Sequence, residues 1–295
     1  MNLKNLSMQD KNNIDFIGIG AQRCGTSWIY ACLYEHPEIC MPFKEIHFFS
    51  RKRNWQKGVD WYKSRFQSCP EDQLKGEFST SYLYSRETAE RIAKNYPHVK
   101  LIASLRNPVE RAISNYRNDI MGNIIPKGMT FKEAISENKD YINQGFYFRQ
   151  IQHYLNFFDR EEVLILIYED TKKDPATFIK KIYEFLEVDI SFKPSMLKKI
   201  IGKSRTPQFI FIDRAIFHTA SFLRRLGLHK LVWVGKKTGI PELIRRLNTE
   251  PEEDPVISGK ERKELEASFA GEVEKLSDFL SRDLSEVWFD YKKYL

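Results

Sequence analysis

The sequence predicts an α/β fold: a P-loop-like central parallel sheet with helices on both faces, followed by a helical C-terminal extension or lid. Three apolar stretches rich in β-branched residues predict buried strands, over Ile14–Gly20, Val99–Leu105 and Val163–Tyr168. Segments with helical patterns separate them. This alternation of strands and helices is typical of a parallel sheet that is covered by helices.

Length and composition favour one globular domain. The chain has 295 residues, of which 42% are hydrophobic, enough for a sizeable core. We expect a single domain over residues 1–295, with an α/β core over 14–190 that would bind a cofactor and a mostly helical extension over 200–295. The net charge of +7 is explained by a solvated Lys/Arg surface or by a polyanionic ligand. Without a long basic block or a nucleic-acid-binding motif, no nucleic-acid partner is expected.

Two features bear on the compartment. Residues 1–13 are polar, and no window of about 18 apolar residues follows, so we expect neither a signal peptide nor a membrane anchor. The spacing of the cysteines (Cys24, Cys32, Cys40 and Cys69) matches no zinc pattern. We therefore expect a cytoplasmic protein with four free thiols and no metal site.

The junction after the first strand is typical of a phosphate cradle. Gly20 and Gly25 bound a turn, and Thr26 and Ser27 follow at the start of a predicted helix, where backbone N–H groups and the helix dipole attract an anion. Nucleotide triphosphatases carry Lys where this chain has Thr26, and the basic residue here is Arg23. This argues against Mg-ATP chemistry, and an ordinary strand–turn–helix junction remains the alternative.

A carboxylate and an imidazole lie together among aromatic residues in the segment Lys44–Phe49. Apolar neighbours raise the pKa of a carboxyl group, which would make Glu45 a proton acceptor near neutral pH. His47 is the other candidate base. The alternative is a loop that its aromatic residues anchor while Lys44 and Glu45 face water.

The next part of the chain supplies more of the layers. Lys57–Phe66 predicts a short amphipathic helix whose aromatic residues belong to the core. Lys75–Tyr82 predicts a short strand that runs into a polar turn. Arg86–Tyr96 predicts a helix that Pro97 stops.

The strand over Val99–Leu105 ends in a cation. A Mg-dependent triphosphatase would place an Asp near this point, whereas this chain has Arg106, which suits a second phosphate. Pro108 begins the next helix, and Ser114 lies about two turns inside it, on a side that could match Arg106. The carboxyl ends of parallel strands are where ligands bind, so Arg23 and Arg106 should lie at one edge. A surface Arg and a helix-interior Ser are the alternative.

Further helices are predicted over Gly145–Phe158, Asp174–Leu186 and Lys260–Leu280. Trp288 and Phe289 should pack the C-terminal part against the core. The apolar but charge-broken stretch Phe209–Val234 predicts a lid, with contact to a membrane surface as the weaker alternative.

Taken together, these residues resemble the sulfotransferase superfamily over about Phe16–Glu187. Its enzymes move a sulfuryl group from 3′-phosphoadenylyl sulfate (PAPS) to a hydroxyl or amine and release adenosine 3′,5′-bisphosphate (PAP). Gly20–Ser27 looks like the loop that holds the 5′-phosphosulfate. Leu105–Tyr116 looks like the segment that holds the 3′-phosphate, which makes Arg106 and Ser114 the expected ligands of that phosphate.

Lys44–Phe49 is similar to the segment of heparan-sulfate-type sulfotransferases that carries the catalytic Glu, which implies Glu45. Two departures separate this chain from that branch. The branch has Lys where Arg23 stands, and often a Lys where this chain has Phe78; many bacterial members look similar to this chain in both respects. The acceptor, whether a saccharide, a glycolipid or a small metabolite, therefore does not follow from the resemblance.

The resemblance implies a full set of site residues without a metal. The expected catalytic residues are Glu45, Arg23 and His47. Lys203 and Arg205 are expected to close over the 3′-phosphate. The complete set of expected cofactor ligands is Gln22, Arg23, Cys24, Gly25, Thr26, Ser27, Arg106, Ser114, Lys203 and Arg205. A P-loop phosphotransferase and a catalytically silent binding protein are the alternatives, and the sequence gives no oligomeric state.

Overall fold

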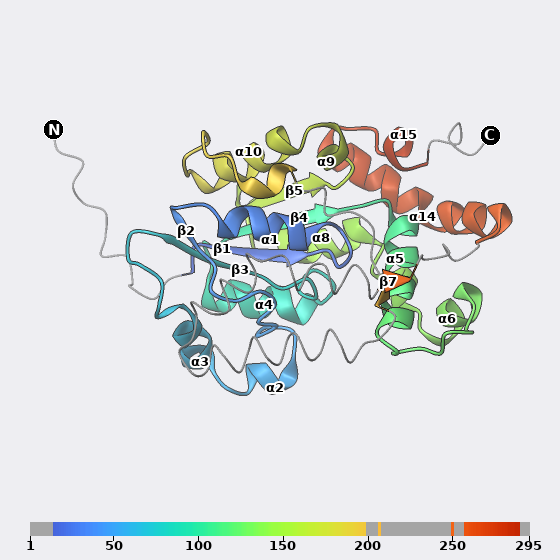
Figure 1. Ribbon diagram of the computed structural model, residues 1–295, viewed down its shortest axis with the longest axis horizontal. Helices are drawn as coiled ribbons and strands as arrows, with labels where there is room; N and C mark the ends of the chain where they lie inside the picture. Colours follow the sequence, from blue (N-terminus) through green and yellow to red (C-terminus); the bar gives the residue numbers. More distant parts are fainter. Residues whose placement is uncertain (1–13, 199–205, 208–248, 251–256, 290–295) are drawn as a thin grey trace. The chain divides into compact units, whose positions relative to one another are not determined.

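A five-stranded parallel sheet forms the centre of the part of the chain that the structure describes (Figure 1). The computed structural model describes residues 14–198, 206–207, 249–250 and 257–289. In spatial order the strands are β2 (Ile39–Cys40), β3 (Leu74–Phe78), β1 (Phe16–Gly20), β4 (Lys100–Leu105) and β5 (Val163–Ile167). Each neighbouring pair is parallel, which confirms the predicted fold class.

The centre of the sheet is apolar because helices cover both faces. Every residue of β1 is buried, as expected for a central parallel strand. Its register with β3 is tightly defined, since Gly18 lies opposite Phe78 and a Cβ on Gly18 would approach the Phe78 ring to 2.1 Å. The parallel pairing places the carboxyl ends of β1, β3 and β4 at one edge.

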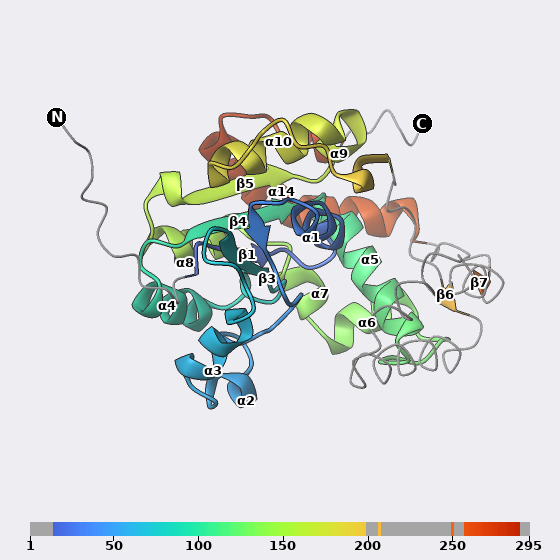
Figure 2. The same ribbon diagram turned by 60° about the vertical axis from the view of Figure 1, so that its left-hand side comes forward.

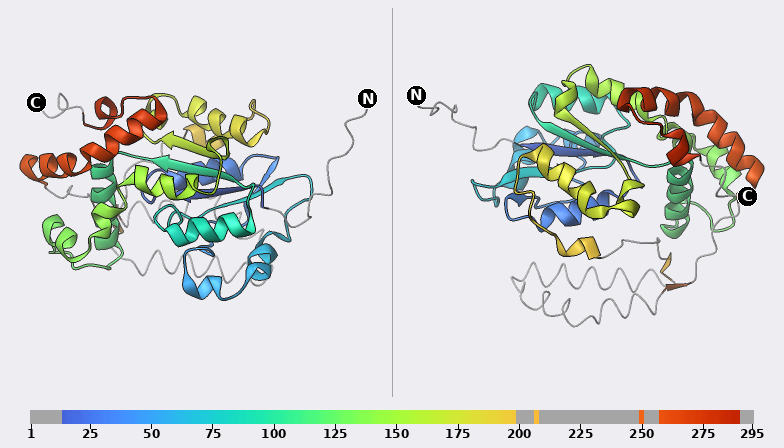
Figure 3. Two further views of the ribbon diagram at one scale, coloured as in Figure 1. Left: turned by 180° about the vertical axis from the view of Figure 1, so that it is seen from behind. Right: turned by 90° about the horizontal axis from the view of Figure 1, so that it is seen from above.

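Two layers of helices enclose the sheet (Figure 3). One layer contains α1 (Thr26–Tyr34) and α10 (Pro175–Leu186), and the other contains α4 (Arg86–Asn95) and α8 (Tyr147–Leu155). In the first layer the rings of Trp28 and Phe178 pack 5.9 Å apart and join a cluster that includes Ile102 of the sheet. The predicted core therefore lies between the sheet and its helices.

Local sequence signals set the helix boundaries. The Ser85 side chain accepts a hydrogen bond from the Thr88 amide at the start of α4, which ends at Asn95, just before Tyr96 and Pro97. The Asp174 side chain caps α10, with a proline at its first position. The predicted helix bounds are thus confirmed to within a residue at these ends.

The remaining elements include a helical excursion between β2 and β3, seen below the sheet in Figure 1. It holds α2 (Lys52–Trp55), α3 (Val59–Lys63) and the 3₁₀ turn η1 (Ser64–Phe66), so the predicted helix over 57–66 is divided. The other elements are α5 (Pro108–Met121), α6 (Phe131–Glu137), α7 (Asp140–Asn143), η2 (Arg160–Glu162), α9 (Asp170–Lys173), η3 (Ser195–Lys198), α14 (Gly259–Leu280) and α15 (Ser285–Trp288).

One aromatic residue of the excursion lies outside the predicted core. Tyr62 and Phe66 are buried as predicted, but Trp61 is only half-buried. Its ring carries two cations, with Lys57 Nζ 4.0 Å and the Arg65 guanidinium 5.0 Å from the centroid. Cation–π contacts of this kind favour a ring near the surface.

The chain divides into two compact units, one of residues 1–116, 132–201 and 257–295, the other of residues 117–131 and 202–256. The first contains the sheet. In the second, β6 (Thr206–Pro207) pairs with β7 (Thr249–Glu250) in antiparallel fashion. The predicted phosphate ligands Lys203 and Arg205 and the predicted lid over 209–234 lie outside the described residues, and the predicted domain limits stay a prediction.

The expectation of four free thiols is wrong. Cys40 and Cys69 form a disulfide with Cα atoms 5.7 Å apart, while Cys24 and Cys32 are free and buried (Figure 2 shows the excursion that the disulfide closes). The pairing depends on β2 lying beside β3, which the spacing of the cysteines does not reveal. Disulfides are typical of oxidising compartments, and the cytoplasmic assignment stays a prediction. Within the described ranges, no helix is long and apolar enough to cross a membrane.

The disulfide should contribute measurably to stability. It joins residues 29 positions apart, and closing a loop of that length stabilises a fold by about 3 kcal/mol. We expect the double variant Cys40→Ser/Cys69→Ser to lose up to that amount in urea unfolding. Dithiothreitol should shift wild type by the same amount and leave the double variant unchanged. An equal response of both proteins to dithiothreitol would show that the bond does not support the fold.

Candidate active site

The predicted phosphate cradle lies at the edge where β1 ends. Gly25 is the N-cap of α1 and has φ of +78°, a conformation that favours glycine. A Cβ at this position would lie 2.5 Å from the Tyr168 ring, so the contact also requires glycine. No side chain caps the start of α1, because its N-cap is Gly25. The positive end of the helix is therefore not occupied by a capping side chain, as an anion site requires.

Arg23 connects the cradle to the helix after β4. Its Nε donates to Ser114 Oγ over 3.0 Å, and Ser114 is 9% exposed on α5. The backbone of Arg23 is left-handed, with φ of +68°, which is uncommon for a residue with a Cβ. The structure therefore brings together two residues that the sequence assigns to opposite ends of one nucleotide.

Arg106 extends from the end of β4 toward the same place. Its guanidinium lies 5.3 Å from the centre of the Tyr168 ring, the ring that also limits Gly25. The nearest carboxylate contact is with Glu110, at 3.7 Å, and the other oxygen of Glu110 binds Arg262 at 2.6 Å. A partly exposed guanidinium with so distant a carboxylate can turn to an anionic ligand at low cost.

Cys24 contributes no accessible thiol. Its side chain is fully buried, with Sγ 3.8 Å from the Tyr147 hydroxyl and 3.5 Å from the carbonyl of Gln22. Burial raises the pKa of the thiol to about 11, so it stays protonated at neutral pH. The Cys24 carbonyl accepts a hydrogen bond from Ser104 Oγ, which fixes the loop to β4. The predicted contribution of Cys24 to ligand binding is thus limited to its backbone.

Glu45 and His47 form the second half of the site. His47 Nε2 lies 3.1 Å from Glu45 Oε2, and His47 Nδ1 lies 2.8 Å from Ser81 Oγ. Both residues have left-handed backbones, with φ of +60° and +51°. Two such residues on either side of Ile46 are costly, and backbone strain of this kind clusters at functional sites.

Lys44 joins this pair to the cradle. Its Nζ donates to Ser27 Oγ over 2.8 Å and to Glu45 Oε1 over 3.3 Å. The alternative interpretation, in which Lys44 and Glu45 simply face water, does not describe this arrangement. The contact places the candidate base beside the predicted 5′-phosphate loop.

The expected rise in the pKa of Glu45 is wrong. The hydrogen bond from His47, together with the charge of Lys44, lowers the pKa of this carboxyl to about 2 despite its partial burial. Phe48 and Phe49, the aromatic neighbours that suggested an apolar pocket, are fully buried and pack against Tyr62. Glu45 is therefore ionised at neutral pH and ready to accept a proton, though as a weak base.

Sequence reasoning missed the residues that orient this pair. Thr80 Oγ1 donates to Glu45 Oε1 over 3.4 Å, and Ser81 contacts His47. The Glu45 amide donates to the carbonyl of Phe78 over 2.8 Å, so the base segment continues along the end of β3. The polar run directly after a predicted strand was the signal that could have found them.

The C-terminal part is fixed to the segment that holds Arg106. The Asn107 side chain donates to the carbonyl of Trp288, and Trp288 Nε1 donates to Glu169 Oε2 over 2.9 Å. Glu169 Oε1 in turn accepts from the Asn107 amide. Trp288 and Phe289 are buried, which confirms that they pack the end of the chain down.

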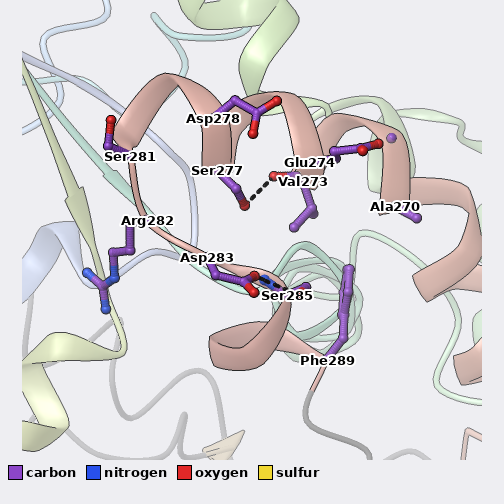
Figure 4. Close-up of a pocket in the computed structure, with 11 residues that line it drawn as sticks. Ala270, Val273, Glu274, Ser277, Asp278, Ser281, Arg282, Asp283, Ser285 and Phe289 are labelled. Carbon is purple, nitrogen blue, oxygen red and sulfur yellow. Dashed lines mark hydrogen bonds between the residues drawn. The ribbon is translucent and has the colours of Figure 1, made fainter.

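A cavity of about 770 Å³ lies beside α14 and α15 (Figure 4). Most of its charged lining residues are acidic: Glu274, Asp278 and Asp283. The one cation among the described residues of the lining, Arg282, is already held by both oxygens of Asp170, at 2.6 and 2.7 Å. Since like charges repel, this cavity does not suit a phosphate-bearing ligand, and none of the predicted site residues that the structure describes lines it.

Curated relatives with similar sequences are sulfotransferases. The chain is 31% identical to the human heparan sulfate glucosamine 3-O-sulfotransferase 3B1 over 57% of its own length and 44% of the relative's. It is 28% identical to the mouse heparan sulfate glucosamine 3-O-sulfotransferase 5 over 58% of its length and 52% of the relative's. The chain thus matches about half the length of these relatives.

A solved structure agrees with the fold. The sulfotransferase from Alicyclobacillus acidocaldarius is 25% identical, with a TM-score of 0.68 over 94% of this chain and 98% of that one. The family model described as the sulfotransferase domain matches residues 13–208, which are more than half of the chain and hold the cradle, Glu45 and Arg106. The chain therefore belongs to the sulfotransferase domain family.

Proposed function

We propose that this protein transfers a sulfuryl group from PAPS to a hydroxyl or amine of an acceptor. The observation that carries the proposal is the contact between Arg23 of the cradle and Ser114 of α5. It supports one ligand with two anionic groups, because the cradle suits one phosphate and the Arg106–Ser114 segment suits another. PAPS carries such groups at its 5′ and 3′ positions.

Each group of the donor has a matching part of the protein. The N-terminus of α1, with Thr26 and Ser27, would hold the 5′-phosphosulfate. Arg106 and Ser114 would hold the 3′-phosphate, and a guanidinium can bind it through two hydrogen bonds. Lys203 and Arg205 remain proposed additions from outside the described residues. With cations in these places, the proposal requires no metal.

The chemistry would be an in-line displacement at sulfur, which depends on positioning and charge stabilisation. Glu45 would accept the proton of the acceptor hydroxyl, and His47, 3.1 Å away, would share it or act as the alternative base. Arg23 would balance the negative charge on the departing phosphate oxygen without donating its own proton, since a guanidinium stays protonated.

We propose a saccharide as the acceptor class. The support comes from the names of the relatives, which act on glucosamine in heparan sulfate. A glycolipid or a small metabolite with a hydroxyl would fit the same chemistry. Incubation of the protein with labelled PAPS and a panel drawn from all three classes would decide among them.

Binding of PAP should depend on Arg106. By calorimetry we expect the protein to bind PAP tightly and AMP weakly, and to show no preference for Mg-ATP over PAP. The variant Arg106→Ala should weaken PAP roughly 10- to 100-fold, because a charge-assisted bond to the 3′-phosphate is lost, and leave AMP nearly unchanged.

The control for this experiment is Arg86→Ala, since Arg86 is exposed, pairs with Glu90 on α4 and is not among the predicted ligands. It should bind PAP like wild type. Equal weakening of PAP and AMP by Arg106→Ala would contradict the assignment. Preferred binding of Mg-ATP would favour a phosphotransferase in its place.

The Glu45 carboxyl group should stay ionised at pH values well below the ordinary pKa of a glutamate. A lowered pKa means that the carboxylate persists as pH falls past 4.5 and is protonated only near 2. We expect the ¹³C NMR titration of the Glu45 carboxyl to show this, and His47→Ala to raise the pKa of Glu45 because the main stabilising hydrogen bond is lost. Glu45→Gln should reduce turnover about 10²- to 10⁴-fold. Titration of Glu45 near pH 4.5 in the wild-type protein would contradict the lowered pKa and the hydrogen bond from His47 that explains it.

Arg23 should act mainly through its charge. Arg23→Lys keeps the charge but loses the Nε–H that contacts Ser114, so we expect it to retain part of the turnover. Arg23→Ala should lower turnover about 100- to 1000-fold. Comparison of kcat for the two variants tests this, and equal loss in both would mean that the planar geometry of the guanidinium is essential.

A further inference from the structure

A buried carboxylate, Glu77 of β3, lies behind the segment that carries Glu45 and His47. It is fully buried, and the chemistry proposed above does not use it. The Ile46 amide donates to Glu77 Oε2 over 3.4 Å. The His47 amide donates to Ser79 Oγ over 2.9 Å, and Ser79 Oγ donates to the same Glu77 oxygen over 2.6 Å.

The next two amides reach the other oxygen of this carboxylate. Phe48 and Phe49 donate their N–H groups to the Tyr82 hydroxyl, over 2.8 and 3.4 Å. Tyr82 donates its hydroxyl to Glu77 Oε1 over 2.7 Å. Tyr62 donates to the same oxygen over 3.1 Å. Four consecutive amides thus point, directly or through one hydroxyl, at one side chain.

The hydrogen bonds that converge on Glu77 offset the conformational cost of the left-handed backbones of Glu45 and His47. Glu45 and His47 hold left-handed conformations that an unsupported chain would leave, and such strain persists only where the surroundings over-determine it. Every group around Glu77 donates, which matches a carboxylate and not an amide. Burial raises the pKa of Glu77, and the hydrogen bonds from Ser79, Tyr82 and Tyr62 oppose that shift.

We propose that Glu77 is a positioning residue, which fixes the backbone of residues 46–49 and so holds Glu45 and His47 against each other. The end of β3 completes the arrangement, since Thr80 and Ser81, which follow Glu77, contact the two side chains. The claim about turnover rests on the proposed sulfotransfer, whereas the claim about the backbone does not.

A matched pair of variants separates positioning from general stability. Tyr82→Phe and Tyr62→Phe each delete one hydroxyl that donates to Glu77 Oε1, and both rings are fully buried. Only the Tyr82 hydroxyl also accepts the loop amides. Hydrogen exchange of residues 46–49 in the full chain, measured without donor or acceptor, is the first readout.

We expect Tyr82→Phe to raise exchange roughly tenfold across residues 46–49, including the Ile46 and His47 amides that Tyr82 does not touch. Tyr62→Phe should leave these rates within about twofold of wild type. Glu77→Gln should raise them at least as much as Tyr82→Phe, because the amide NH₂ meets groups that donate. If the two Tyr variants behave alike, or if Glu77→Gln protects the segment as wild type does, the proposal is wrong.

Turnover gives the second readout. Tyr82→Phe and Glu77→Gln should lower kcat while the KM for PAPS and the affinity for PAP stay at wild-type values, since the cradle is untouched. A loss of PAP affinity in proportion to kcat would indicate a general structural defect and overturn the assignment. If wild type binds no PAP, the proposed function fails, and the exchange contrast still decides the role of Glu77.

Discussion

The site depends on the parallel register of β1 with β3 and β4. That register brings three connecting segments to one edge: the cradle after β1, the polar turn after β3 and Arg106 after β4. The contact of Gly18 with the Phe78 ring holds it, because a slip by one residue would put a side chain where the ring lies. The chemistry of the edge is therefore a product of packing in the middle of the sheet.

At that edge, the side chains of Lys44 and Arg23 each contact groups from other elements. Lys44 contacts Ser27 on one side and Glu45 on the other, which joins the candidate base to the cradle and helps to keep its carboxyl group ionised. Arg23, within the cradle, donates to Ser114 and so joins the cradle to α5. An arrangement in which each group is held by a neighbour from another element has little to reorganise when a ligand arrives, which is what electrostatic preorganisation requires.

The sequence predicted four of the five strands of the sheet, the turn and helix start after β1, and the placement of Arg23 and Arg106 at one edge, since each follows from local periodicity or from the rule for parallel strand ends; it did not predict β2. It failed where the answer depends on side chains from distant elements. The low pKa of Glu45 comes from His47 and Lys44, and the left-handed backbones of Glu45 and His47, which bring those two side chains together, are not visible in the sequence. Cys40 and Cys69 meet only because β2 lies beside β3, and Glu77 looks like any strand residue until the amides around it are placed.

The disulfide encloses the chain between residues 40 and 69, and Glu45 and His47 both belong to that covalent ring. The ring also contains the exposed basic stretch around Arg51, Lys52 and Arg53, a ready site for a trypsin-like protease. A cut there would leave two fragments that stay joined through sulfur, with the amide of Glu45 still bonded to β3. While the disulfide is intact, cleavage in this exposed stretch would therefore not detach the segment that carries the candidate base from the rest of the chain.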